Sequence, residues 1–173
     1  EILATGGGKV FKSFDDGKTW QEITTTGAFT SGTFMVRIRR NNTAWVGFDI
    51  DGFPWRSVDG IAWTKGPTAI IGNTVTASID HDDGSTWIIT DGSSGFVYVS
   101  YNDGVTWIAK GVANQSSGID YSSKLSRWFA TEEGEASANS KTNCLSSIDA
   151  DEWTVRELPG DFRWRGVRTN SKG

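Results

Sequence analysis

Hydrophobic and polar residues follow one another along this chain in short runs that are typical of β-strands. Residues 97–100 (Val-Tyr-Val-Ser) and 86–90 (Thr-Trp-Ile-Ile-Thr) are examples, and Gly, Asn, Asp and Ser separate such runs throughout the sequence. Branched and aromatic residues are enriched in strands, whereas those separators favour turns. No window with helical periodicity longer than about 10 residues competes with this pattern. The sequence therefore predicts an all-β protein.

A second pattern recurs along the whole chain at a nearly constant interval. Four segments end in a tryptophan, and the four tryptophans lie 43, 44 and 46 residues apart. Two of the segments, Ser-Phe-Asp-Asp-Gly-Lys-Thr-Trp and Ser-Tyr-Asn-Asp-Gly-Val-Thr-Trp, have eight residues, and the other two are one residue shorter. The four segments are residues 13–20, 57–63, 100–107 and 147–153. The chain is therefore interpreted as four copies of one structural repeat.

Each repeat contains four predicted strands, here named inner, second, third and outer in chain order. The third strand ends at the serine that begins each of the four segments, and the outer strand follows the segment. The second strands begin near Leu3, Trp45, Trp87 and Trp128, which are assigned to one repeat position. The predicted inner strands are 34–38, 75–79, 118–121 and 162–168; the second strands are 2–5, 44–48, 86–90 and 127–131; the third strands are 10–13, 54–57, 97–100 and 144–147; and the outer strands are 20–23, 63–65, 107–109 and 153–158.

Four strands in a period of about 43 residues are the signature of a β-propeller blade. The fold class is therefore predicted to be an all-β propeller of four-stranded antiparallel blades, in a single domain over residues 1–173. The sequence starts at a second strand and ends with an inner strand. Two architectures follow: a four-bladed ring closed by pairing residues 162–168 with the N-terminal strands, or a four-repeat segment of a larger propeller.

The repeated segment resembles the Asp-box, also called the BNR repeat, Ser-x-Asp-x-Gly-x-Thr-Trp. The first and third copies match it throughout, except that Asn102 replaces the aspartate, and the shorter copies lack the threonine. The resemblance implies a hairpin turn between the third and outer strands, with a structural role. The matching residues are Ser13, Asp15, Gly17 and Trp20; Ser57, Asp59, Gly60 and Trp63; Ser100, Asn102, Gly104 and Trp107; and Ser147, Asp149 and Trp153.

Composition excludes several classes of site. The chain has a single cysteine and a single histidine, so it can form neither an intrachain disulfide framework nor a His/Cys zinc cluster. Its net charge of −4 argues against nonspecific nucleic-acid binding, and no apolar run approaches a membrane span. No cofactor is expected. Alternating carboxylates make residues 80–84 and 49–52 candidates for calcium binding, but the glutamate of an EF-hand is missing, so these segments are interpreted as turns.

Candidate ligand-binding residues lie on the predicted inner strands. These strands hold Arg37, Arg39, Arg40, Asp80, His81, Asp120, Arg163, Arg165 and Arg168. Arg163-Trp164-Arg165 is the most distinctive cluster, because an aromatic ring between arginines can stack on a sugar or hold an anionic group. Arg163, Trp164, Arg165, Arg37 and Arg39 are selected as the ligand-binding residues.

Asp-box propellers include both enzymes and binding proteins. A sialidase needs an arginine triad, a tyrosine nucleophile with its glutamate, and six blades. The sialidase family also carries an Arg-Ile-Pro type of motif, which is missing here because Arg39 follows Arg37-Ile38. The favoured hypothesis is a non-catalytic recognition or scaffold propeller that binds a surface glycan or receptor, with virion or surface-protein subunits as further partners. The expected location is a phage virion or tail, or the extracellular surface. The alternatives are a sialidase-like or other glycoside hydrolase, and a structural or assembly factor.

Overall fold

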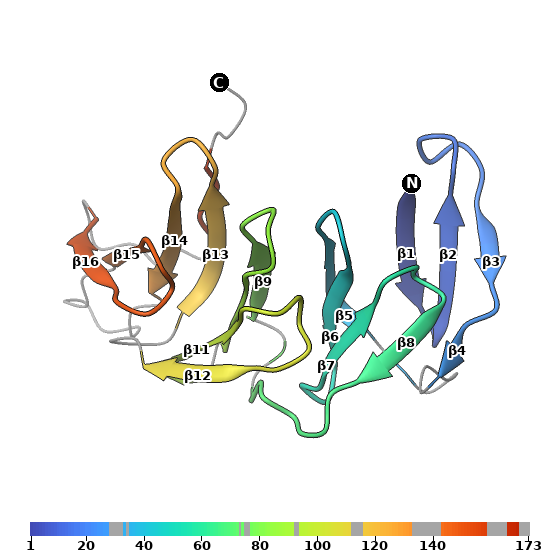
Figure 1. Ribbon diagram of the computed structural model, residues 1–173, viewed down its shortest axis with the longest axis horizontal. Coiled ribbons are helices and arrows are strands. Elements are labelled where there is room, and N and C mark those ends of the chain that lie inside the picture. Colours follow the sequence, from blue (N-terminus) through green and yellow to red (C-terminus); the bar gives the residue numbers. More distant parts are fainter. Residues whose placement is uncertain are drawn as a thin grey trace.

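The computed structural model describes residues 1–27, 33, 35–72, 74, 77–91, 94–111, 116–132, 143–158 and 166–169. In these residues the fold consists of four antiparallel sheets arranged side by side in an arc (Figure 1). The all-β prediction is therefore confirmed. The described part contains no helix long and apolar enough to cross a membrane.

The four sheets follow the four repeats. The first has three strands, β1 (Ile2–Gly6), β2 (Lys9–Ser13) and β3 (Gln21–Ile23). The second contains β5 (Met35–Arg40), β6 (Trp45–Asp49), β7 (Pro54–Ser57) and β8 (Ala62–Lys65), and the short β4 (Thr26–Gly27) pairs with β8 in parallel. The third contains β9 (Ser78–His81), β10 (Trp87–Thr90), β11 (Phe96–Ser100) and β12 (Ile108–Gly111). The fourth contains β13 (Ser116–Ser122), β14 (Arg127–Glu132), β15 (Asn143–Ser147) and β16 (Thr154–Glu157).

The inner strands of neighbouring sheets lie next to one another: β5 contacts β9, and β9 contacts β13. The predicted order of inner, second, third and outer strand is confirmed in the second, third and fourth sheets, and the first sheet has its second, third and outer strands in the predicted order. One assignment of the sequence analysis is wrong. Trp45, Trp87 and Trp128 each pair with a box serine, and the residue that pairs with Ser13 is Ile2 rather than Leu3.

Side chains from facing sheets form three hydrophobic clusters, one for each pair of neighbouring sheets. The first and second sheets share Leu3, Val10, Trp45, Trp55 and Trp63. The second and third sheets share a cluster that includes Val46, Phe48, Trp87 and Ile89, and the third and fourth share one that includes Ile88, Val97, Trp128 and Leu145. The core therefore lies between the sheets, as the blades of a propeller require.

Of the two predicted architectures, the closed ring is not seen among the described residues, and residues 162–165 of the predicted closing strand lie outside them. β1 pairs only with β2, and residues 166–169 hydrogen-bond to β13 instead of the first sheet. The N-terminal and C-terminal sheets stand at opposite ends of the arc (Figure 1). Each junction is filled by bulky side chains such as Trp45, Trp87 and Trp128, so neighbouring sheets stay nearly face to face and four of them form only part of a circle.

Candidate functional site

The four box segments form tight turns held by their own polar side chains. In the first turn Ser13 Oγ donates to Asp15 Oδ1 at 2.9 Å and accepts from the amide of Gly17 at 2.8 Å. Asp15 also accepts from the amide and hydroxyl of Thr19, and these hydrogen bonds lower the pKa of the Asp15 carboxyl. In the third turn Asn102 accepts from the amide of Thr106 at 2.9 Å, so an amide side chain performs the same task.

The left-handed backbone of these turns explains most of their glycines. Gly17, Gly60 and Gly104 have φ values of 86°, 71° and 77°, where a glycine is favoured because it has no Cβ. The fourth turn adopts the same conformation with Ala150 at φ 67°. All four turns lie between a third and an outer strand, and in each turn the serine hydroxyl bonds to the aspartate or asparagine side chain of the same turn. These residues therefore stabilise the fold.

The box tryptophans differ in burial according to their neighbours. Trp63 is 2% exposed against the first sheet, whereas Trp20 is 45% exposed. Both indole N–H groups donate to the glycine carbonyl of their own turn, at 3.2 and 3.1 Å. The turns are thus alike, and the difference comes from the sheet that covers Trp63.

The carbonyl before each box glycine or alanine receives a hydrogen bond from the preceding repeat at three junctions. Lys12 Nζ donates to the Asp59 carbonyl, and Arg56 Nε donates to the Asp103 carbonyl at 2.7 Å. At the third junction the donor is the Tyr101 hydroxyl, 3.3 Å from the Asp149 carbonyl. This hydroxyl also bonds to Asp151, and burial together with that bond raises the pKa of Tyr101 to about 12.

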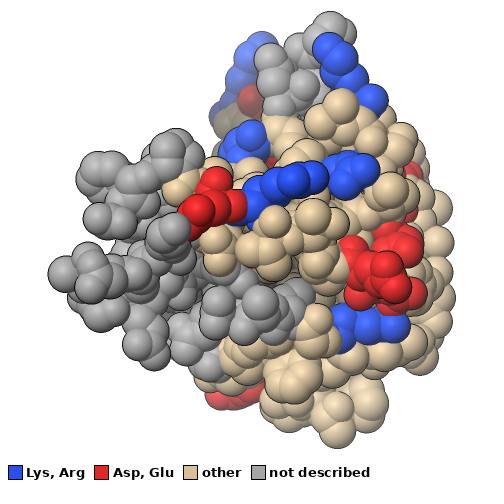
Figure 2. Space-filling model, turned by 90° about the vertical axis from the view of Figure 1, so that its left-hand side faces the viewer, with Lys and Arg blue, Asp and Glu red and all other residues tan. Residues whose placement is uncertain are grey.

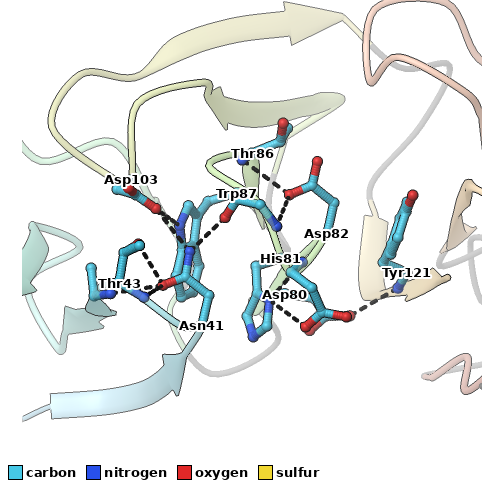
Figure 3. A network of polar contacts seen from close by, with 12 residues as sticks. Asn41, Thr43, Asp80, His81, Asp82, Thr86, Trp87, Asp103 and Tyr121 are labelled. Atoms are coloured by element: carbon cyan, nitrogen blue, oxygen red, sulfur yellow. Dashed lines mark hydrogen bonds and ion pairs between the residues drawn. The ribbon is translucent and has the colours of Figure 1, made fainter.

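The junction between the second and third sheets contains a larger polar network (Figure 3). Asn41 is buried; its amide donates to the Gly84 carbonyl at 2.6 Å and to Asp103 Oδ1 at 2.8 Å, and its Oδ1 accepts from the amides of Thr43 and Ala44. The Trp87 indole donates to the same Asp103 oxygen at 3.3 Å. The network binds one repeat to the next, and we assign it a structural role.

A row of charged side chains follows the inner strands, and it is the candidate functional site. Arg39 pairs with Val46, Asp80 with Ile88, and Asp120 with Phe129, so the three occupy one register position on β5, β9 and β13. Arg168 continues the row beyond β13, where its guanidinium lies 3.0 Å from Asp120 Oδ1. The order of charges along this inner-strand row is therefore positive, negative, negative, positive.

Asp80 and Asp120 have different electrostatic surroundings. Asp80 Oδ2 accepts from the amide of Tyr121 at 2.8 Å (Figure 3), yet burial raises the pKa of the Asp80 carboxyl, and the neighbouring charge of Asp120 raises it further. The Asp120 carboxyl forms an ion pair with the Arg168 guanidinium at 3.0 Å. The row thus holds one carboxyl that bonds to a backbone amide of the next sheet and one that pairs with an arginine.

The next residue along each inner strand contacts a tryptophan of the second strand. Arg40 lies over the Trp45 ring at 5.4 Å, and the rings of His81 and Trp87 are 4.7 Å apart. The third pair, Tyr121 and Trp128, has a centroid distance of 4.9 Å. Because side chains alternate between the two faces of a strand, these contacts leave the charged row on the opposite face.

Of the five residues selected from the sequence, two can be placed. Arg39 belongs to the inner-strand row, and Arg37 lies two residues earlier on the same face of β5. Each guanidinium donates to a carbonyl of its own strand, Arg37 to Val36 at 3.0 Å and Arg39 to Ile38 at 3.1 Å. Arg163, Trp164 and Arg165 lie outside the described residues.

The residues selected from the sequence do not include Asp80, Asp120 and Arg168, although all three belong to the predicted inner strands. Their common register position would have been the signal, and it becomes visible only when each inner strand is aligned through its second-strand partner. The row also lies near the ends of the inner strands from which residues 41–44, 82–86 and 122–126 turn back. The hydrogen bond from the Asn41 amide to Asp103, which belongs to a box turn, shows that the box turns lie at this same end.

In the two calcium candidate segments Asp49 and Asp82 bond to amides of the turns that follow them, whereas Asp80 lies on β9 and bonds to β13. Asp49 Oδ1 accepts from the amides of Asp51 and Phe53, and its Oδ2 accepts from the Trp55 indole at 2.8 Å. Asp82 Oδ1 accepts from the amides of Gly84 and Thr86. Among the residues that the structure describes, no three His, Cys, Asp or Glu side chains gather as a metal site.

Comparison with known proteins identifies the fold. No family model matches the sequence, and no curated protein matches it. Among solved structures, one titled "Crystal structure of Nidogen/Laminin Complex" matches with a TM-score of 0.63 and 14% identity over 91% of this chain and 61% of that chain. "YCF48 bound to D1 peptide" matches with a TM-score of 0.60 and 13% identity over 91% of this chain and 50% of that chain.

An enzyme structure belongs to the same set. The GH74 enzyme of Niastella koreensis has a TM-score of 0.59 and 19% identity over 86% of this chain and 26% of that chain. The chain thus spans about a quarter to three fifths of these proteins. At such identities the likeness concerns the fold alone, and together with the four antiparallel sheets it shows that this chain is a β-propeller, open in its described part.

Proposed function

We propose that this protein is a non-catalytic recognition propeller that binds a surface receptor through its inner-strand row. The observation that carries the proposal is the alignment of Arg39, Asp80 and Asp120 at one position of three adjacent strands, continued by Arg168. A rigid scaffold that aligns charged groups of both signs favours a ligand with complementary charges of both signs. A protein segment meets this requirement better than a glycan whose only charge is a carboxylate.

The solved structures lend this proposal support of a limited kind. One of them contains a peptide bound to YCF48 and another is a complex of nidogen with laminin, so proteins with this fold bind protein partners. The virion or cell-surface setting expected from the sequence is part of the proposal. A surface glycan is the second ligand class, because arginines such as Arg37 also hold acidic sugars.

Parallel peptide and glycan arrays test the proposal. The parent chain is applied to both arrays, and the strongest ligand is then measured by surface plasmon resonance with an Arg37→Ala/Arg39→Ala double variant. Arg156→Ala is the matched control, because Arg156 lies exposed on the outer strand β16. We expect the double variant to bind at least about tenfold more weakly, a loss of roughly 1.4 kcal/mol, and the control to bind as the parent does.

Two results would contradict the proposal. Equal binding by the parent and the double variant would show that the inner-strand row is not part of the ligand site. If the parent chain binds nothing on either array, the recognition role itself is contradicted.

A glycoside hydrolase is the second candidate function, favoured by one observation. Asp80, whose pKa is raised, lies one strand away from Asp120, which is paired with Arg168. Glycosidases use a pair of carboxyl groups, and the acid of the pair has a raised pKa. Turnover of a fluorogenic glycoside panel that includes a sialoside, abolished by Asp80→Asn, would replace recognition by catalysis as the function.

A further inference from the structure

One position of the box turns is hydrophobic in every repeat and yet stays outside the core. The residue that follows the box serine has a large hydrophobic side chain in all four turns, although the box pattern leaves this position open. The four residues are Phe14, Val58, Tyr101 and Ile148, and their exposed fractions lie between 41% and 68%. Single exposed hydrophobic residues are ordinary on a protein surface, but a turn position that is exposed and hydrophobic in every repeat is a pattern.

The residue after the box glycine or alanine adds to this surface in the two middle turns. It is Ile61 in the second turn and Val105 in the third, and both are exposed, whereas the first and fourth turns have the charged Lys18 and Asp151. The hydrophobic surface is therefore densest over the second and third turns, whose sheets have a neighbouring sheet on both sides. We call six residues the turn ridge: Phe14, Val58, Ile61, Tyr101, Val105 and Ile148.

Hydrogen bonds between neighbouring turns make the turn ridge one continuous surface. The Tyr101 side chain itself reaches from the third turn to the Asp149 carbonyl of the fourth, at 3.3 Å. Arg56, directly before the second turn, donates to the Asp103 carbonyl of the third turn at 2.7 Å, and the equivalent lysine of the first repeat donates to the second turn. Contiguous exposed hydrophobic surface of this kind marks a site of interaction.

Acidic side chains stand beside the hydrophobic ones along the turn ridge. The four box turns contain seven Asp and Glu residues and a single Lys. Amide hydrogen bonds within the turns lower the pKa of the Asp15 and Asp149 carboxyls, which keeps both groups ionised at neutral pH. The fourth turn is the most acidic, and Figure 2, which views the molecule from the side of the fourth sheet, shows a compact group of acidic side chains on the right. The turn ridge is therefore hydrophobic and negatively charged at once.

This charge decides between the possible occupants of the turn ridge. Two copies of the chain, which has a net charge of −4, would bring like charges together, and an anionic lipid surface would do the same. A protein segment with hydrophobic and basic side chains meets both requirements, because its hydrophobic groups cover the ridge while its lysines or arginines face the carboxylates. We propose that the turn ridge is a second binding surface of this protein, and that it docks a basic, hydrophobic segment of a partner protein.

The turn ridge and the inner-strand row are different surfaces of the molecule. The row lies on the inner strands, whereas the ridge lies on the turns between third and outer strands, and the third strand is two strands away from the inner strand of its sheet. The partner segment that docks on the ridge is therefore additional to the receptor proposed for the row. Substitutions on one surface leave the other intact.

Fluorescence anisotropy with three labelled synthetic peptides tests the proposal. The first peptide repeats Leu-Lys-Ser four times, the second has glutamate in place of each lysine, and the third has serine in place of each leucine. The parent chain should bind the first peptide and bind each of the others at least about tenfold more weakly, because one lacks the complementary charge and the other lacks the hydrophobic groups. Added salt should weaken binding of the first peptide, since it screens exposed charges.

A Val58→Ser/Val105→Ser double variant locates the binding on the turn ridge. It removes two exposed hydrophobic side chains from the middle turns and should weaken binding of the first peptide at least about tenfold. The matched control is Ile50→Ser/Phe96→Ser, because these residues are 59% and 46% exposed but lie at the ends of β6 and β11 that are remote from the box turns. The control should bind as the parent does. Both variants should unfold at the urea midpoint of the parent, since all four side chains are exposed.

Several results would overturn the proposal. They include failure of the first peptide to bind, equal binding of all three peptides, and equal binding by the parent and the Val58→Ser/Val105→Ser variant. Self-association of the parent in sedimentation velocity that this variant abolishes would make a second copy the occupant, and binding to phosphatidylcholine vesicles that it abolishes would make a membrane the occupant. None of these results bears on the inner-strand row, which the Arg37→Ala/Arg39→Ala variant tests by itself.

Discussion

Alanine substitutions at Trp63 and Trp20 measure how much stability comes from packing between sheets. The two side chains share one turn position and one indole hydrogen bond, but Trp63 is 2% exposed and Trp20 is 45% exposed. A buried tryptophan removes roughly 200 Å² from water, which at about 25 cal/mol per Å² is worth about 5 kcal/mol. After roughly 1 kcal/mol is subtracted for the remaining alanine, Trp63→Ala should lower the free energy of unfolding by about 4 kcal/mol.

The same arithmetic gives about half this loss for Trp20→Ala, so the two variants should differ by about 2 kcal/mol. Urea unfolding followed by far-ultraviolet circular dichroism measures both variants. Trp20→Ala serves as the control for the turn itself, because it removes the same hydrogen bond. Equal losses for the two variants would refute the reasoning, since they would show that the turn, and not the neighbouring sheet, makes each tryptophan stabilising.

Three further substitutions test other contacts. Gly104→Ala should destabilise by about 2 kcal/mol in urea unfolding, because residue 104 has left-handed φ and the new Cβ would lie 2.9 Å from Val46; no loss would show that the turn tolerates alanine here as it does at Ala150. Asn41→Ala should lower stability by about 3 kcal/mol in the same assay, since buried amides lose their acceptor, and an unchanged midpoint would contradict the role of that network. Asp80→Asn should raise the melting temperature relative to the parent more at pH 7 than at pH 4. The folded-state pKa of Asp80 is raised, so the stabilising contribution of its carboxyl is present at low pH and lost as pH rises. A gain in melting temperature from Asp80→Asn that becomes smaller as pH rises would contradict this reasoning.

The strands next to the box turns could be predicted closely from the sequence. Each turn fixes where the third strand ends and the outer strand begins, so the predicted third strand 54–57 coincides with β7. The inner strands were harder, because charged residues such as Arg39 and Asp80 interrupt the hydrophobic pattern, and the predicted 75–79 is observed as Ser78–His81. Ring closure depends on the angle between packed sheets, which the volumes of side chains such as Trp87 determine and a count of repeats does not.

The candidate site could be predicted only in part for a related reason. Arginine side chains on inner strands can be selected by residue type, and Arg39 belongs to the observed row. The row itself depends on how β9 and β13 align with each other across a junction, and the hydrogen bond from the Tyr121 amide to Asp80 fixes that alignment. A sequence read one repeat at a time contains no record of this contact.

The carbonyl that precedes each box glycine or alanine has a consequence for recombining repeats. Its donor is a lysine, an arginine and a tyrosine at three successive junctions, and each donor belongs to the repeat before the acceptor. A repeat moved to a new position would keep its acceptor but meet a donor of another length. Exchange between related propellers should therefore succeed more often when the segment transferred begins inside one repeat and ends inside the next, so that donor and acceptor travel together.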